Sequence, residues 1–472
     1  MTWDLAIIGG AATGRLIASA AAQMNAKVIL IERDRFRRHP SWGNGVAKQS
    51  FLHAAELAYN LKQASRFGLH FQDPQLDFAQ TIDCIQNAIA SVPLENSFAD
   101  LGIETIFGAA KFIDSRTLVV EDREITARAF AIAASSRPAI PFIPGLADVG
   151  YLTAEQIFSF SACPDSLAVI GSGAVACELA QAFQRLGSQV TIIASRDRLL
   201  PQEDWEAVEI LQQQFIAEGI RILTNIRIEK VDLINGKKYL YAGEQKIIAD
   251  EILVAVGRQP EIEFLNLAAA GVTVNQRGIR VNRQLQTSNR QIYACGDAIG
   301  SYNFNHTASY EVNAILQNAL FFPRSKVNYR LVPWAIFTYP ELARVGLNEE
   351  QARVIYGKDA IALRQDFTRV ERAQAQAKTL GFAKIVVRTN GEILGAQFVG
   401  QSASELIHEI VLAMSGGLKV SALAKIARVY PSLSAINSKA ARQFVSPTQR
   451  KPKIWQPLFR NFLYWWRSQF KF

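Results

Sequence analysis

The strongest constraint on the fold is a glycine-rich turn that occurs twice, each time after a short apolar strand pattern and before a helical pattern. The first turn follows the apolar residues 5–8, and the second follows residues 167–170. A strand, a glycine turn, a helix and a second strand form half of a doubly wound parallel sheet. One such domain has no place for both turns, so the sequence predicts two Rossmann-type α/β domains and two bound nucleotides.

The first turn, Gly9-Gly10-Ala11-Ala12-Thr13-Gly14, is predicted to hold the pyrophosphate of a dinucleotide. Glycines let backbone N–H groups approach the phosphates, which then lie at the positive end of a helix dipole. Glu32 ends the next strand pattern, where a carboxylate can accept both hydroxyls of an adenosine ribose. Ala11 replaces the usual middle glycine, and its methyl group is expected to crowd the phosphate. The predicted binding residues are Gly9, Gly10, Ala11, Gly14, Glu32 and the adjacent Arg33; the alternative is an ordinary tight turn with a solvated glutamate.

The second turn differs at the end of its second strand pattern, residues 189–193, where Ala194-Ser195-Arg196 replaces the ribose acid. A carboxylate there repels a 2′-phosphate, whereas Ser195 and Arg196 can bind one through charge-assisted hydrogen bonds. The sequence therefore favours NADP(H) over NAD(H). Arg198 is a second candidate, and the alternative is that both arginines are solvated loop charges. The predicted binding residues of this turn are Gly171, Gly173, Ala176, Ser195 and Arg196.

Composition and charge exclude several other classes of protein. The chain has 472 residues, of which 49% are hydrophobic and 20% charged, as in a globular protein with more than one core. The net charge is +9, but residues 447–472 hold six basic residues and no acid, so the main body offers no nucleic-acid face. Cys84, Cys163, Cys177 and Cys295 have no zinc-site spacing, so no metal site is predicted. Because a signal peptide and a long apolar run are both missing, a cytoplasmic location is expected.

Further motifs resemble the flavin disulfide reductases, the class I pyridine nucleotide-disulfide oxidoreductases that include dihydrolipoamide dehydrogenase, glutathione reductase and mercuric reductase. Residues 287–297, which end in Gly296 and Asp297, resemble the family's second flavin motif. Residues 135–138 and 252–260 resemble the two links between its FAD and NAD(P) domains. Residues 332–347 resemble the start of its dimerisation domain.

The resemblance implies FAD, a nicotinamide coenzyme and a homodimer. It implies that Gly257, Gly296 and Asp297 belong to the cofactor site, with Asp297 on the ribityl chain of FAD, and that Glu178 lies near the nicotinamide ring. It also divides the chain into a first FAD segment at 1–148, an NAD(P) domain at 149–266, a second FAD segment at 267–329, a dimerisation domain at 330–446 and a basic aromatic tail at 447–472.

The sequence departs from the family where the thiol chemistry would be. The family places a CxxxxC pair just after the first ribose acid, but residues 39–55 contain no cysteine. An ungapped match to the downstream His-Ala-Ala puts Pro40 and Gly45 at the cysteine positions. A shift by one residue puts His39 and Asn44 there. A disulfide relay requires sulfur in either alignment.

The other catalytic elements of the family differ as well. In the shifted alignment Lys48 matches the family lysine near the flavin and can pair with Glu178; the unshifted alignment leaves this open. Tyr430 and Ala435 replace the family's active-site histidine and glutamate, and no cysteine follows Cys295. Reduction of disulfides or of mercury is therefore not expected.

Two classes of function remain. The first is an enzyme in which FAD takes a hydride from NADPH and passes electrons to an acceptor without a thiol, such as a quinone, a dye, a metal complex or oxygen. Glu178 and Lys48 are its candidate catalytic residues, and the polar residues 42–49 are expected to line the flavin. The second is a binding or sensing protein that keeps FAD after losing catalysis. Retention of both nucleotide turns and of Glu178 favours the enzyme.

The tail is predicted to bind the surface of an anionic membrane. A helix is expected over residues 458–470, after three prolines. Its apolar residues recur at helical spacing on one face, with the basic residues outside that face, as in helices that lie in the membrane interface. The alternative is that this face packs on the protein's own dimer or on a partner helix. The apolar face consists of Leu458, Phe459, Phe462, Trp466 and Phe470.

Overall fold

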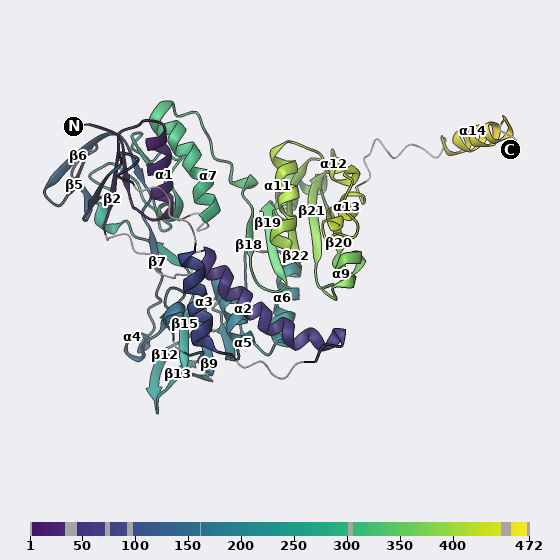
Figure 1. The fold of residues 1–472 in the computed structure, drawn as a ribbon, viewed down its shortest axis with the longest axis horizontal. Coiled ribbons are helices and arrows are strands. Elements are labelled where there is room, and N and C mark those ends of the chain that lie inside the picture. The colour runs from purple at the N-terminus through teal and green to yellow at the C-terminus, as the bar shows by residue number, and fades with distance from the viewer. Residues whose placement is uncertain are drawn as a thin grey trace. The chain divides into compact units, whose positions relative to one another are not determined.

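A computed structural model describes residues 2–33, 45–70, 76–91, 98–160, 162–300, 305–444 and 455–469. The chain forms two compact units (Figure 1). The first comprises Met1–Pro201 and Gln212–Asn328, and the second comprises Gln202–Leu211 and Tyr329–Phe472. The finer division into five segments stays a prediction.

The first unit contains two sheets, each built around four parallel strands in the same order; the fifth parallel strand follows these four in one sheet and precedes them in the other. In one, the strands run β3-β2-β1-β6, and β17 pairs with the far side of β6. The central strand β1 (Trp3–Ile8) ends in four fully buried residues, because helices such as α1 (Ala12–Gln23) cover the sheet. The other strands are β2 (Val28–Glu32), β3 (Glu104–Phe107), the hairpin strands β4 (Ala110–Phe112) and β5 (Thr117–Val120), β6 (Arg123–Ile132) and β17 (Ile292–Ala294).

The second sheet of this unit runs β11-β10-β9-β15-β8, all parallel. Helix α5 (Ala174–Arg185) follows β9 and is buried over most of its length. A three-stranded antiparallel sheet accompanies it, as the β4-β5 hairpin accompanies the first sheet. The expectation of two Rossmann-type domains is confirmed. The strands are β8 (Leu152–Thr153), β9 (Ser166–Ile170), β10 (Gln189–Ile193), β11 (Arg221–Leu223), β12 (Lys230–Ile234), β13 (Lys237–Ala242), β14 (Gln245–Ala249) and β15 (Glu251–Val254), and a short helix α4 spans Leu146–Val149.

A two-stranded antiparallel ribbon stands where the chain passes between the two sheets. Strand β7 (Ser136–Pro138) leaves the first sheet after β6, and β16 (Arg258–Pro260) returns after β15. Their register pairs Arg258 with Pro138 and Pro260 with Ser136. The ribbon therefore brings together two segments that are far apart in sequence.

Helix α2 (Gly45–Gln63) packs against α3 (Phe78–Ala90) and α5 (Figure 1). A group of aromatic rings lies in this contact. The ring of Phe51 lies 5.4 Å from that of Phe183, 6.4 Å from Phe78 and 6.0 Å from Phe158. Pairs of aromatic rings at such distances stabilise a fold by more than the burial of their apolar area alone. These ring contacts hold α2 against α5 close to Lys48, which lies three residues before Phe51.

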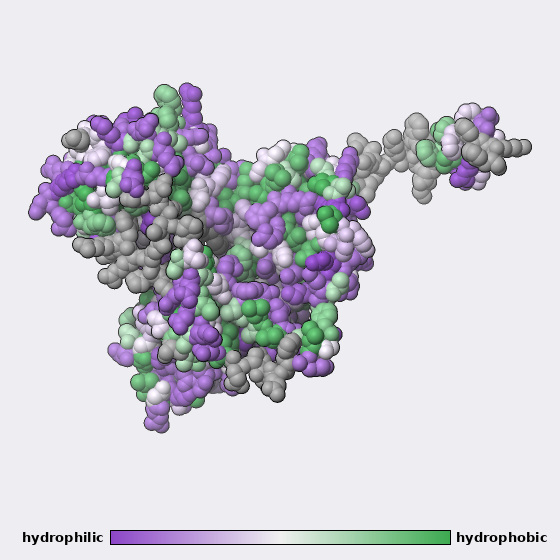
Figure 2. Space-filling view, in the orientation of Figure 1, coloured by the Kyte–Doolittle hydropathy of each residue, from purple (hydrophilic) through white to green (hydrophobic). Residues whose placement is uncertain are grey.

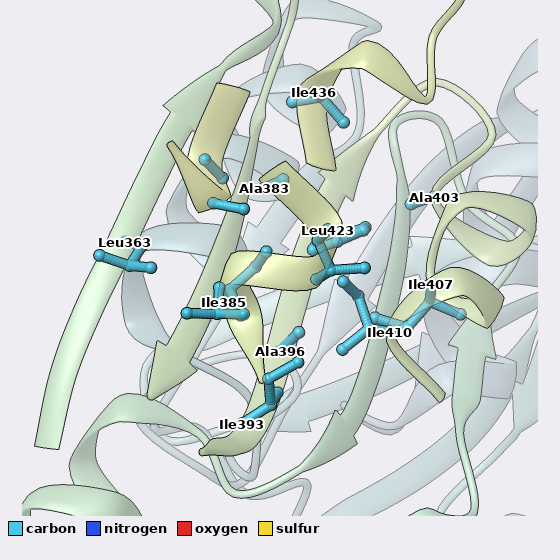
Figure 3. Close-up of a cluster of buried hydrophobic side chains, with 14 of the residues drawn as sticks. Leu363, Ala383, Ile385, Ile393, Ala396, Ala403, Ile407, Ile410, Leu423 and Ile436 are labelled. Carbon is cyan, nitrogen blue, oxygen red and sulfur yellow. The ribbon is translucent and has the colours of Figure 1, made fainter. Parts of the chain in front are cut away.

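The second unit is an antiparallel sheet, β18-β19-β22-β21-β20, covered by short helices. Buried aliphatic side chains from the sheet and from helices α9–α13 form its core (Figure 3). The α+β dimerisation domain expected from the sequence is thus confirmed as a fold. Its strands are β18 (Trp334–Ile336), β19 (Glu341–Gly346), β20 (Ala360–Asp366), β21 (Phe382–Arg388) and β22 (Ile393–Gly400); its helices are α8 (Glu349–Tyr356), α9 (Glu371–Ala375), α10 (Ala403–Leu406), α11 (His408–Ser415), α12 (Val420–Lys425) and α13 (Ala435–Ala441).

The short segment Gln202–Leu211, at the start of α6 (Trp205–Ala217), packs in this second unit. Lys384 of β21 is only 4% exposed, and its Nζ lies 3.3 Å from Asp204 Oδ2 and 2.9 Å from Glu349 Oε2. Burial disfavours the lysine charge, but these carboxylates raise the pKa of Lys384 above its ordinary value. Arg344 lies 3.6 Å from Glu203 Oε2. Buried ion pairs therefore hold the segment Gln202–Leu211 against the antiparallel sheet of the second unit.

Helix α14 spans Trp455–Gln469 and so begins earlier than the expected residue 458. Pro457 lies in its first turn, where the missing N–H needs no helical partner, so the proline does not delay the helix. Phe470 lies outside the described residues. Figure 2 shows hydrophobic and hydrophilic residues side by side on this helix. Across the described parts of the chain, no helix is long and apolar enough to cross a membrane.

Candidate active site

The first glycine turn joins β1 to α1 and depends on the close approach of backbone from β6. Gly9 has φ +106°, and a Cβ there would lie 2.3 Å from the carbonyl oxygen of Ala133. Gly14 is buried in the first turn of α1. Ala11 is exposed and extended, with φ −67° and ψ 179°, a conformation that an alanine adopts without strain. The backbone therefore accepts this departure from the usual glycine.

Glu32 lies at this turn, as the sequence predicts. Its carboxylate accepts hydrogen bonds from the backbone N–H of Gly10 and, at 2.8 Å, from that of Arg33. The Arg33 guanidinium lies 3.5 Å from Glu261 and 5.3 Å from the ring centroid of Phe264. The structure thus brings the predicted ribose acid and the glycine turn together across 22 residues of sequence.

The second turn repeats this arrangement between β9 and α5. Gly171 has φ +147°, and a Cβ there would lie 2.3 Å from the carbonyl oxygen of Ala255. Gly173 immediately precedes α5, and Ala176 is buried within its first turn. No side chain caps α1 or α5 within the described residues, so the N–H groups of their first turns can bind phosphates.

The candidate 2′-phosphate site follows β10. Ser195 and Arg196 are both exposed, and the backbone carbonyl of Arg196 accepts a hydrogen bond of 2.7 Å from Asn225. Arg198 instead donates from Nη2 to the carbonyl of Pro201 at 3.0 Å. Arg196 therefore presents the more accessible guanidinium of the two candidates.

Lys48 and Glu178 form an ion pair, although 130 residues separate them in sequence. Lys48 Nζ lies 2.7 Å from each carboxylate oxygen of Glu178. The Glu178 side chain is fully buried and that of Lys48 is 19% exposed. Lys48 is the fourth residue of α2, and Glu178 is the fifth residue of α5. Of the stretch expected to line the flavin, residues 42–44 lie outside the described residues, as do His39 and Pro40, so the structure describes only residues 45–49.

Asp297 and its neighbour Gly296 make hydrogen bonds to distant residues that sequence patterns did not reveal. Its carboxylate accepts a hydrogen bond from the hydroxyl of Ser136, and the N–H of Gly296 donates to Glu311 Oε2 at 2.6 Å. Glu311 is fully buried on α7 (Asn305–Leu316). A glutamate in an apolar helix face was the available signal for Glu311, whereas Ser136 lies 161 residues from Asp297 and had none. Gly257, with φ +131°, connects β15 to the ribbon strand β16.

Two protein-family models match the chain. Residues 3–311 match the model of the pyridine nucleotide-disulphide oxidoreductases, and residues 332–440 match the dimerisation domain of the same proteins. The chain belongs to the pyridine nucleotide-disulphide oxidoreductase family. Membership supports FAD and a pyridine nucleotide as cofactors, and the dimerisation domain indicates a homodimer.

Relatives in this family include enzymes of two kinds. Over 430 residues the chain is 35% identical to a mercuric reductase from Staphylococcus aureus, covering 89% of this chain and 78% of that protein. It is 32% identical to a dihydrolipoyl dehydrogenase from Bacillus subtilis, covering 91% and 96%. Among solved structures, LpdA from Mycobacterium tuberculosis superposes with a TM-score of 0.83 at 26% identity, covering 94% of this chain and all of that one.

The residues present fit the FAD that the pyridine nucleotide-disulphide oxidoreductase family implies. Gly9 has no side chain where backbone segments approach closely, so the turn leaves room for a bound group. The uncapped first turn of α1 would offer N–H groups to a pyrophosphate, and Glu32 would accept hydrogen bonds from ribose hydroxyls. Across the described ranges, no group of three or more His, Cys, Asp or Glu side chains lies together as a metal site.

Proposed function

We propose that this protein is an FAD-dependent NAD(P)H oxidoreductase that passes electrons to an acceptor other than a disulfide, such as a quinone, a dye, a metal complex or oxygen. The observation that carries the proposal is the Lys48–Glu178 ion pair, which joins α2 to the helix of the second nucleotide turn. The pair is retained in a chain whose residues 39–55 contain no cysteine.

Bound FAD supplies the redox chemistry, because it accepts a hydride from the nicotinamide and returns electrons to the acceptor. The protein's part is to bind and orient. The first turns of α1 and α5 hold the phosphates of the two nucleotides. Glu178 orients the nicotinamide ring. Lys48 neutralises this buried carboxylate and places a cation beside the reacting groups, where burial strengthens electrostatic interactions.

The cysteines of the chain support an acceptor other than a disulfide. All four are free; Cys84 lies in α3 and Cys177 in α5, whereas Cys163 and Cys295 lie in loops. Burial raises the pKa of the thiols of Cys163, Cys177 and Cys295, which disfavours the thiolate needed for disulfide exchange. Cys84 is exposed on α3. A lone exposed thiol has no partner cysteine nearby in sequence with which to cycle.

Anaerobic NADPH is expected to bleach the flavin absorbance of the purified protein without a long-wavelength thiolate–flavin charge-transfer band. Alkylation of the reduced protein with iodoacetamide is expected to leave the bleaching rate unchanged, because no thiol takes part. A dihydrolipoyl dehydrogenase treated in the same way is the control. Rapid reduction of lipoamide or glutathione disulfide contradicts the proposal, and absence of bleaching by either coenzyme favours a binding or sensing protein that keeps FAD.

We also propose that NADPH is preferred over NADH because Arg196 binds the 2′-phosphate. Arg196→Glu is expected to lower the ratio of the NADPH to the NADH rate by about ten- to a hundred-fold, since a carboxylate replaces a charge-assisted bond. The matched control is Arg221→Glu, the same charge change on the exposed first residue of β11. A wild type that prefers NADH, or an equal effect of both variants, contradicts this assignment.

The tail supports the further proposal that the protein is cytoplasmic and bound peripherally to an anionic membrane. The apolar residues Leu458, Phe459 and Phe462 of α14 are 57%, 66% and 52% exposed. Leu458 and Phe462 are four residues apart and share a face, whereas Arg460 and Arg467, seven apart, share another. Such a helix binds anionic lipid by burying its apolar face among the headgroups. A membrane surface would favour a lipid-soluble quinone as the acceptor.

A further inference from the structure

The ribbon of β7 and β16 carries a chain of hydrogen bonds that ends on Asp297. Arg258 Nε donates to Ser136 Oγ at 2.7 Å, and the Ser136 hydroxyl donates in turn to Asp297 Oδ2. Arg258 Nη2 also donates to the backbone carbonyl of Ser136 and lies 2.9 Å from Glu155 Oε1. Ser136 is only 6% exposed. One arginine therefore contacts the serine at two points and is itself held by a carboxylate.

The direction of these hydrogen bonds follows from the chemistry of the first and last groups, the guanidinium of Arg258 and the carboxylate of Asp297. An arginine side chain has only donors and keeps its charge throughout the physiological range, so Ser136 Oγ must accept from it. An ionised carboxylate has only acceptors, so the single hydroxyl hydrogen of Ser136 must point to Asp297. The hydroxyl cannot rotate to another partner without breaking a charge-assisted bond.

We infer that Ser136 and Arg258 are positioning residues for the carboxylate of Asp297. This inference rests on the proposed role of Asp297 in binding FAD. The hydrogen-bond relay formed by Arg258, Ser136 and Asp297 holds one carboxylate oxygen of Asp297. It leaves the other oxygen to accept a hydrogen bond from a hydroxyl of the flavin's ribityl chain. Because Arg258 stands on the strand that returns from the second nucleotide sheet, the flavin acid is also tied to the place where the chain crosses between the sheets (Figure 1).

The test is the affinity for FAD, measured by diluting the holoprotein and following the fluorescence of released flavin to equilibrium. Ser136→Ala is expected to weaken binding by roughly ten- to a hundred-fold, the value of a hydrogen bond to a charged group. Arg258→Met is expected to have a similar effect, because the hydroxyl is then free to rotate. Ser136→Thr, which keeps the hydroxyl, is expected to restore most of the affinity.

A double-mutant cycle separates positioning from simple support of the ribbon. If the relay acts as one unit, Ser136→Ala combined with Arg258→Met weakens binding hardly more than either change alone. The matched control is Arg137→Met on the same ribbon, whose guanidinium pairs with Glu263 at 2.8 Å and takes no part in the relay. This variant is expected to bind FAD as the wild type does.

The outcomes are distinguishable from those of the proposed function. A wild type that binds FAD, with Ser136→Ala and Arg258→Met at wild-type affinity, overturns the relay and leaves the proposed function intact. Additive losses in the double variant, or an equal loss in Arg137→Met, overturn it too, since they indicate loss of ribbon stability. A wild type that binds no FAD overturns both. Thermal unfolding of each variant identifies any protein that is simply misfolded.

Discussion

Purified protein carrying Glu32→Ala or Asp297→Ala is expected to be colourless, whereas the wild type is yellow with one FAD per chain. Glu32 holds the glycine turn through Gly10 and is placed to accept the ribose hydroxyls, so alanine removes both interactions. Each lost charge-assisted hydrogen bond weakens binding by about ten- to a hundred-fold, and two or more such bonds suffice to strip the flavin during purification. The measurement is the ratio of flavin to protein absorbance.

The control for this experiment is Glu104→Ala in β3, a strand of the same sheet. Glu104 pairs with Arg123 at the surface and is remote from the glycine turn in the strand register, where Ile29 is its neighbour. This variant is expected to stay yellow. Flavin retained at wild-type affinity by both Glu32→Ala and Asp297→Ala would remove the assignment of the flavin site.

Full-length protein is expected to sediment with vesicles of anionic phospholipid, and a version ending at Ser446 is expected to remain in the supernatant. The apolar face of α14 supplies most of the binding. The ring centroids of Phe459 and Phe462 on this face lie 6.4 Å apart, and the ring of Trp465 beside the face lies 6.0 Å from that of Phe462. Each basic residue near the surface adds about 1 kcal/mol. Salt is therefore expected to weaken binding without abolishing it.

Two controls identify what the tail binds. Phe462→Ser is expected to reduce sedimentation strongly, whereas Phe142→Ser, which removes a 97% exposed phenylalanine outside the tail, is expected to leave it unchanged. Vesicles of neutral phosphatidylcholine are expected to bind much less. Equal partitioning of the full and shortened chains refutes the membrane proposal. A change of oligomeric state on shortening, without vesicle binding, assigns the helix to protein contacts instead.

Features that depend on neighbouring residues were predictable from sequence. The strand β10 has the expected bounds, Gln189–Ile193, because hydrophobic periodicity acts within a few residues. The position of Glu32 beside the first glycine turn was predictable because a βαβ unit brings the end of its second strand next to the turn after its first strand. The start of α14 was wrong by three residues because a proline in a first helical turn was treated as a break.

Features that depend on distant residues were not predictable. Two alignments of residues 39–55 left the pairing of Lys48 with Glu178 open, and only the packing of α2 on α5 brings the two charges to 2.7 Å. The same holds for the relay from Arg258 to Asp297, whose members come from three separate segments. No periodicity in sequence carries such contacts, because tertiary packing creates them.

The segment Gln202–Leu211 affects how the C-terminal domain can be exchanged between proteins, because it packs in the second unit although it comes from the middle of the chain. A fragment cut before Tyr329 and transplanted as a dimerisation cassette would leave Asp204 and Glu203 behind. Lys384 would then keep Glu349 but lose a buried counter-charge, and Arg344, whose side chain is 7% exposed, would lose Glu203. Removing one member of a buried ion pair costs roughly 3–5 kcal/mol. A chimera of two family members would therefore keep the fold best when the ten residues Gln202–Leu211 come from the same parent as the region that begins at Tyr329.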